Sequence, residues 1–239
     1  MFGGRLTVVV KNIIIINVIM FLATSVLGDW FNEAMAGHWI GSDAFRPWQI
    51  VTHMFMHGGF SHIFFNMFGV FIFGVMLEQV WGPKKFLTYY LLSGLGAMVL
   101  HFLVVYFRIN YVESMMSVTQ IAEVYQNGYE ILKNHQNYTD VNAASLNMLV
   151  NVGMVGASGA LFGLIAGFAM LFPDLKLQLL FPPIPIKART LAMVYGGMEL
   201  ISAFGKPGDH IAHFAHLGGM LFGFMILLYW KKKGTLHSS

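Results

Sequence analysis

The sequence contains no cysteine. Its absence excludes disulfide bonds, thiolate metal ligands and a cysteine nucleophile. Charged residues are also scarce, at 10% of the 239 residues, whereas soluble domains average about 25%. A soluble protein of this length would bury a large core but would still need a charged surface. The shortage of charge therefore argues against a water-soluble domain.

Apolar residues dominate instead, at 56% of the chain, with a mean hydropathy of +0.64. A membrane-spanning helix needs about 20 mostly apolar residues. We predict an all-α membrane protein, a six-transmembrane-helix bundle that forms a single domain over residues 1–239. The fifth predicted span is short. The six predicted spans cover residues 8–27, 63–81, 86–107, 148–172, 190–204 and 211–230.

Lysine and arginine set the expected orientation, because cytoplasmic loops carry an excess of both. With a cytoplasmic N-terminus, ten of the fourteen basic residues lie on the cytoplasmic side: Arg5, Lys11, Lys84, Lys85, Lys176, Lys187, Arg189, Lys231, Lys232 and Lys233. We therefore expect both termini in the cytoplasm, with the stretches 28–61 and 108–147 on the outer side. Because no soluble domain is appended, we expect the plasma membrane of a bacterium.

Polar side chains near the outer ends of the spans are candidates for function, because ionisable groups at membrane depth are costly. Six of the ten histidines form two clusters: His53, His57 and His62, and His210, His213 and His216. Ser158 lies in the fourth span, roughly 15 Å along a straight helix, or nearer the surface if the helix begins at the serine itself. Either placement brings three polar sites together in the outer half of the bundle.

Ser158 and His216 have the residue types of a nucleophile and its base. A serine hydroxyl attacks only when a base, usually a histidine within about 3 Å, takes its proton. Small residues flank both positions and would let their helices approach closely in lipid: Gly159, Gly163, Gly167, Gly219 and Gly223. Close packing of small residues, with a histidine bonded to a carbonyl, is the alternative explanation for each pattern.

His62 and Asn66 are spaced i, i+4 and share one face of the second span. Both side chains can donate hydrogen bonds, and a serine site that cleaves peptides needs donors aimed at the developing oxyanion. The backbone N–H of Ser158 is a third candidate donor. The alternative is a polar pair that holds the outer loop on the bundle.

Several short motifs appear in a fixed order along the chain: Pro47-Trp48-Gln49, His57-Gly58-Gly59-Phe60-Ser61-His62-x-x-x-Asn66, Leu77-Glu78-Gln79-Val80-Trp81-Gly82, Gly156-Ala157-Ser158-Gly159, and His216-x-x-Gly219-x-x-x-Gly223. Each motif is modest alone. Together, over about residues 46–223, they resemble the rhomboid family of intramembrane serine proteases.

The resemblance implies a six-helix fold with a water-filled cavity open to the outer face. It assigns Ser158 as nucleophile and His216 as base. His62 and Asn66 match the family's oxyanion residues, and Gly156 matches the glycine two positions before the serine.

Members of the family use a Ser–His dyad without an essential third carboxylate. Asp209, the acid nearest to His216 in sequence, is accordingly interpreted as a loop residue. The sequence departs from well-known members at Phe162, where a tyrosine stacks on the catalytic histidine. A phenyl ring can still stack there, so only the hydroxyl is lost.

We therefore predict a serine endopeptidase that cleaves transmembrane segments of single-span or polytopic membrane proteins within the lipid bilayer. No cofactor, metal ion or nucleic acid is expected, and the sequence leaves the oligomeric state open. Two alternatives remain: an inactive relative that binds membrane clients, and a histidine-lined metal or solute transporter. For Glu199, a structural bond is favoured over a role in gating, and for His53 and His57, loop structure over metal binding.

Overall fold

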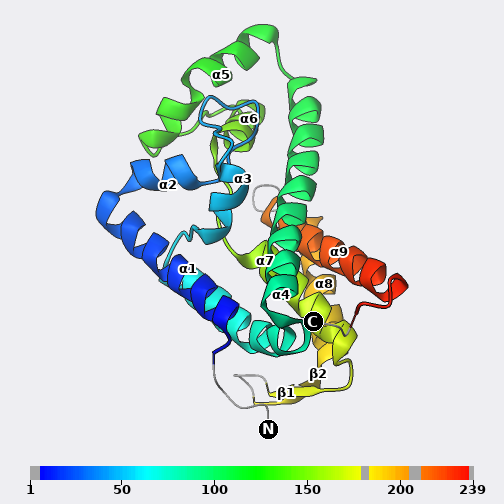
Figure 1. The fold of residues 1–239 in the computed structure, drawn as a ribbon. Helices are drawn as coiled ribbons and strands as arrows, with labels where there is room; N and C mark the ends of the chain where they lie inside the picture. The colour runs from blue at the N-terminus through cyan, green and yellow to red at the C-terminus, as the bar shows by residue number, and fades with distance from the viewer. Residues whose placement is uncertain (1–5, 179–182, 205–210, 237–239) are drawn as a thin grey trace.

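The computed structural model describes residues 6–178, 183–204 and 211–236. The described chain is helical apart from one two-stranded hairpin (Figure 1). In chain order the elements are α1 (Val8–Leu27), α2 (Asp29–Met35), α3 (Gln49–Thr52), the 3-10 helix η1 (His53–Phe55), α4 (Phe60–Glu113), α5 (Val118–Lys133), α6 (Val141–Asn151), α7 (Ser158–Leu171), β1 (Lys176–Gln178), β2 (Pro185–Lys187), α8 (Ala188–Ala203) and α9 (Ile211–Lys232).

The fold is that of an all-α membrane bundle. Within the described residues, α1, α4 and α9 are long and apolar enough to cross a membrane, and α7 is a shorter apolar helix. Large apolar side chains are exposed on the outside of these helices, where lipid would cover them, among them Ile19, Leu22, Phe64, Phe65, Leu103, Phe107, Leu221 and Leu228. The number of membrane crossings stays a prediction.

Most helix bounds lie close to those expected. The first expected span is α1, with the same ends, and α8 and α9 begin and end within two residues of the fifth and sixth spans. The second and third spans are two segments of α4, which bends sharply at Gly82 (φ 73°, ψ 167°) before Pro83. Only a glycine adopts this backbone conformation without strain, and the proline cannot continue the first ladder of hydrogen bonds. Positions 209 and 210 lie outside the described residues.

The expected helix over 148–172 is wrong, because the chain breaks before Ser158. Helix α6 ends at Asn151 and α7 begins at Ser158. Between them the chain runs extended beside the outer loop, where Gly37 and Met154 exchange backbone hydrogen bonds of 2.8 and 2.9 Å. Gly156 has φ +129° and donates its N–H to the carbonyl of His53 at 2.9 Å. These bonds satisfy the backbone groups that a continuous helix would have paired.

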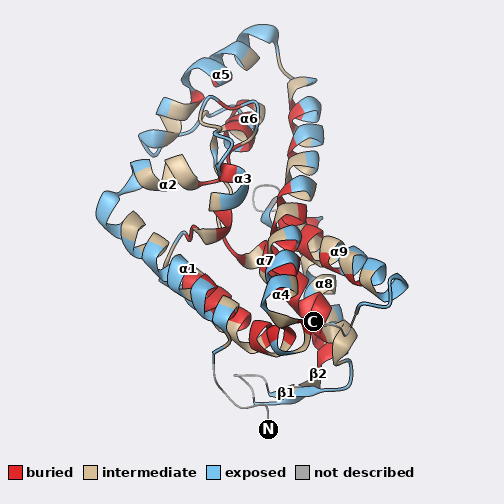
Figure 2. Ribbon diagram, in the orientation of Figure 1, coloured by how far each residue is buried: buried red, intermediate tan, exposed pale blue. Residues whose placement is uncertain are grey.

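Helix α7 lies at the centre of the bundle between α4, α8 and α9, and most of its residues are buried (Figure 2). Its contact with α9 depends on two glycines. A Cβ atom at Gly219 would stand 1.8 Å from the carbonyl oxygen of Gly159. The two backbones therefore touch, as the small-residue faces predict. This close approach brings Ser158 of α7 near His216 of α9.

The N-terminal end of α1 is fixed to α4 by a buried carboxylate. Glu78 accepts hydrogen bonds from the Thr7 hydroxyl at 2.5 Å and from the N–H groups of Val9 and Val10 at 2.9 Å each. These N–H groups at the start of a helix have no partner inside it, and a negative charge there is favourable. Glu78 therefore has a structural role.

At the opposite end from the β1–β2 hairpin, α6 packs on the C-terminal part of α4 and α5 packs on α6 (Figure 1). A separate apolar cluster joins these three helices through residues that include Val105, Val124 and Leu146. The hydroxyl of Tyr129 in α5 donates to Glu33 in α2. The long outer stretch is thus a folded cap rather than an open loop.

Candidate active site

Ser158 is the first residue of α7. At this position its backbone N–H is not used by the helix, because the first amides of a helix have no intrahelical acceptor. The extended segment before it, with Gly156 at φ +129°, brings the serine to the surface of a small cavity. The nucleophile candidate therefore carries both a hydroxyl and an available amide.

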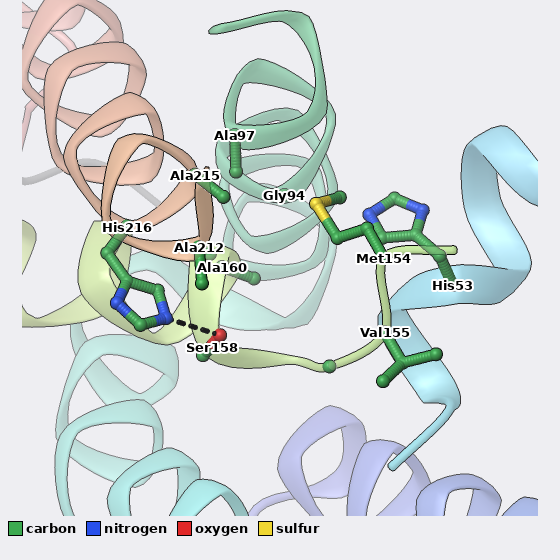
Figure 3. A pocket seen from close by; sticks show the side chains of 12 residues that line it. His53, Gly94, Ala97, Met154, Val155, Ser158, Ala160, Ala212, Ala215 and His216 are labelled. Atoms are coloured by element: carbon green, nitrogen blue, oxygen red, sulfur yellow. Dashed lines mark hydrogen bonds between the residues drawn. The ribbon is translucent and has the colours of Figure 1, made fainter. Parts of the chain in front are cut away.

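His216 of α9 faces Ser158 across the α7–α9 contact. Its Nε2 lies 2.8 Å from the serine Oγ, a hydrogen-bond distance between side chains 58 residues apart in the chain (Figure 3). Phe162, one turn after Ser158, stacks on the imidazole with ring centroids 4.4 Å apart and planes 6° apart. The stacked ring restricts the rotation of the imidazole and keeps Nε2 directed at the hydroxyl.

His62 approaches the serine from α4. A Cβ atom added at Gly156 would stand 2.9 Å from Nε2 of His62 and 3.5 Å from Oγ of Ser158. Gly156 therefore provides the space that His62 occupies. The Gly58 N–H donates to His62 Nδ1 at 3.4 Å, so Nδ1 is the acceptor and Nε2 carries the proton. The Nε2–H donor and the serine hydroxyl therefore both border the space left open at Gly156.

Asn66 is one turn further along the same face of α4. Its Nδ2 donates to the carbonyl of His62 at 2.8 Å, and its buried Oδ1 has no hydrogen-bond partner among the described residues. The carboxamide is therefore buried and only half satisfied. The donor Nδ2 is used within the helix, so Asn66 would have to turn before it could donate to an oxyanion.

A cavity of about 40 Å³ borders both Ser158 and His216. This volume holds one or a few water molecules, which is enough for a hydrolytic water. It is too small for a peptide segment. A substrate would therefore enter only after part of the bundle moves.

The family model described as the Rhomboid domain matches residues 44–233. The chain belongs to the rhomboid family. The Rhomboid protease AarA of Providencia stuartii is 25% identical over 181 residues, which are 75% of this chain and 54% of that protein. RHOMBOID-like protein 5 of Arabidopsis thaliana is 27% identical over 76% of this chain and 44% of its own length. The chain thus spans about half the length of these two relatives.

A shorter match reaches higher identity. RHOMBOID-like protein 6, mitochondrial, of Arabidopsis thaliana is 42% identical over 55 residues, which are 23% of this rhomboid and 18% of that protein. The relatives thus include a protein named as mitochondrial as well as a bacterial one. The family relationship alone does not select the membrane.

His53 supports the site of this rhomboid, and the ring of His57 packs against that of His62 with centroids 4.9 Å apart. The carbonyl of His53 accepts a hydrogen bond from the Gly156 N–H. The Nδ1 of the His53 ring donates to the Gln49 carbonyl at 2.9 Å. Burial lowers the pKa of His53 and of His57 to about 4 each. Both rings are therefore neutral at physiological pH, and His53 fixes the segment before Ser158.

A carboxylate that sequence reasoning did not connect with the dyad lies next to His216. Glu199 Oε2 of α8 is 2.6 Å from His213 Nδ1 and 3.0 Å from His216 Nδ1. The sequence signal was a glutamate at membrane depth. Its partner could not be identified, because the sequence does not fix the register between α8 and α9.

The same three side chains are the one cluster of potential metal ligands in the described parts of the chain, with donor atoms within 4.8 Å of one another. Two ligands of a tetrahedral zinc ion stand about 3.3 Å apart. The two contacts of Glu199, at 2.6 and 3.0 Å, are shorter. Both distances are in the range of hydrogen bonds. The cluster therefore fits a group of hydrogen-bonded side chains better than a metal centre.

Proposed function

We propose that this rhomboid is an intramembrane serine endopeptidase, with Ser158 as nucleophile and His216 as general base. The observation that supports it most is the 2.8 Å contact between His216 Nε2 and Ser158 Oγ. A neutral imidazole at this distance can take the hydroxyl proton as the oxygen attacks.

The proposed reaction has two steps. Oγ of Ser158 attacks the peptide carbonyl, its proton passes to Nε2 of His216, and the imidazolium then protonates the leaving amine. A water molecule next attacks the acyl group, gives a proton to His216, and the regenerated Ser158 leaves with that proton. No cofactor is required.

In this proposal, three donors stabilise the charge on the carbonyl oxygen. They are the Nε2–H of His62, the backbone N–H of Ser158 and, after reorienting, the side-chain amide of Asn66. Preorganised donors of this kind often provide the largest part of catalysis. Gly156 contributes by leaving space for His62.

The proposed substrates are single-span or polytopic membrane proteins. A peptide bond within a helix is shielded, so the segment must unwind locally, and helix-breaking residues near the bond should favour cleavage. Lateral entry past α8 is consistent with the many exposed apolar side chains of this helix, which include Met193, Met198 and Ile201. A bacterial plasma membrane, with both termini cytoplasmic, remains part of this proposal.

The proposal is tested by cleavage of a tagged single-span substrate in liposomes. Purified wild type should cleave it in the presence of EDTA, and a fluorophosphonate should block the reaction. Binding of the substrate without cleavage would favour the client-binding alternative. Metal flux across the liposome membrane without cleavage, unaffected by the fluorophosphonate, would favour the transporter alternative.

Asn66→Ala is expected to lower kcat by roughly 10- to 1000-fold, the range for losing one oxyanion donor. The cleavage assay with the single-span substrate measures the change. Asn110→Ala is the matched control, because Asn110 lies on the same helix and donates to the Tyr106 carbonyl at 2.7 Å in the same i to i−4 pattern. Equal rates in the two variants would remove Asn66 from the oxyanion site.

A further inference from the structure

Glu199 is placed to act on the base of the proposed dyad. If Nε2 of His216 is to accept the Ser158 proton, the neutral ring must carry its own proton on Nδ1. A proton there needs an acceptor, and Oε2 of Glu199 lies 3.0 Å from Nδ1. The carboxylate thus stands on the side of the ring opposite to the serine.

We propose that Glu199 is a positioning residue for His216. Its carboxylate accepts the Nδ1 proton, selects the tautomer that leaves Nε2 free, and stabilises the imidazolium formed when Ser158 attacks. The proton from Oγ goes to Nε2, the Nδ1 proton stays on the ring, and Glu199 stays ionised throughout. This inference rests on the proposed function, and it adds a third member to the dyad.

The contact between Glu199 and Nδ1 of His216 is short but not aligned as a hydrogen bond. The contact has the length of a hydrogen bond, yet Nδ1 of His216 has no partner with hydrogen-bond geometry in the described chain. Catalytic hydrogen bonds are often poorly aligned without substrate and tighten in the bound complex. A small rotation of the imidazole or of the carboxylate completes the bond.

His213 provides the competing explanation. Its Nδ1 is closer to the same oxygen, at 2.6 Å, so Glu199 could simply fasten α8 to α9. A carboxylate oxygen has two lone pairs and can accept from both rings at once. The geometry therefore allows Glu199 both to fasten α8 to α9 and to position His216. The two roles predict different effects of mutations on the pH profile.

The titratable side chains around His216 come from four elements. Glu199 lies on α8, His213 on α9, His62 on α4, and His53 of η1 shares the cavity. Among them Glu199 is the acid. Removing its charge disfavours the imidazolium, so the base stays neutral to lower pH. The side chains from α4 and η1 are the same in every variant compared.

The test is the pH dependence of the second-order rate of Ser158 labelling by a fluorophosphonate, measured in EDTA. In Glu199→Gln, which keeps the size of the side chain, the pH of half-maximal rate should fall by about one unit. The kcat for substrate cleavage should fall roughly 10- to 100-fold, with KM unchanged. Glu199→Asp, which keeps the charge, should hold the half-maximal pH near that of wild type.

Two further variants separate positioning from fastening. His213→Leu removes the contact between α9 and Glu199 but leaves the carboxylate beside His216, so its half-maximal pH should not fall. Glu113→Gln removes a carboxylate that accepts from Tyr125 at 3.0 Å on the outer part of the fold, and its profile should match wild type. Thermal unfolding verifies that each variant is folded.

If wild type is labelled and Glu199→Gln has an unchanged half-maximal pH, the role of Glu199 is overturned and the proposed endopeptidase is not. The same downward shift in His213→Leu would also overturn that role, because fastening would then explain both variants. An unlabelled wild type would overturn the proposed endopeptidase and the role of Glu199 with it.

Discussion

His216→Ala is expected to reduce substrate cleavage by about 10⁴-fold or more, since removing one member of a nucleophile–base pair costs nearly as much as removing both. The imidazole is the base within reach of Ser158, at 2.8 Å. Without it the hydroxyl has no acceptor for its proton and stays a poor nucleophile. Fluorophosphonate labelling of Ser158 should be lost in parallel.

His213→Ala is the matched control for this variant. His213 lies one turn earlier on α9, with its ring centroid 6.4 Å from that of His216, and it faces Glu199. It should keep most of the activity. Both variants should unfold at temperatures close to wild type. Near-normal cleavage by His216→Ala, or a dead His213→Ala that is folded, would show that the base is wrongly assigned.

Gly219→Ala is expected to lower activity by at least about 100-fold, because a misplacement of roughly 1 Å at a catalytic site has an effect of this size. A Cβ at this position would stand 1.8 Å from the carbonyl oxygen of Gly159. Neither atom belongs to a flexible side chain, so α7 and α9 must separate. Separation moves Ser158, next to Gly159, away from His216.

Stability should fall as well, by about 1–3 kcal/mol, as for other overpacked contacts. Gly197→Ala is the control, since a Cβ there meets nothing within 4 Å. Alanine in a helix interior is also favoured over glycine. Cleavage and thermal unfolding measure both variants. A Gly219→Ala protein with wild-type activity would contradict the close backbone contact as the source of the dyad geometry.

Much of the bundle could be predicted from the sequence because lipid imposes a simple rule. A spanning helix must be long and apolar, and α1 accordingly has the ends that its apolar run indicates. The break before Ser158 could not be located in this way. The stretch 148–172 is apolar apart from Asn151 and Ser158, and the break is stabilised by distant backbone partners at Gly37 and His53.

The site residues also differ in how far the sequence predicts their contacts. Ser158 and His216 could be paired because their glycine faces predict a close contact between two helices, and that contact exists. Glu199 could not be paired with His216, since its distance depends on how α8 packs against α9. A contact between two helices could thus be predicted where both carry glycine faces, whereas Glu199 has no such matching pattern on α9.

The decisive experiment is to treat the wild-type protein with a fluorophosphonate and map the adduct by mass spectrometry. A single adduct on Ser158, with loss of cleavage in proportion to labelling, is the expected result. Cleavage that continues in fully labelled protein, or an adduct on a different residue with Ser158 unmodified, would contradict the assignment of Ser158 as the nucleophile.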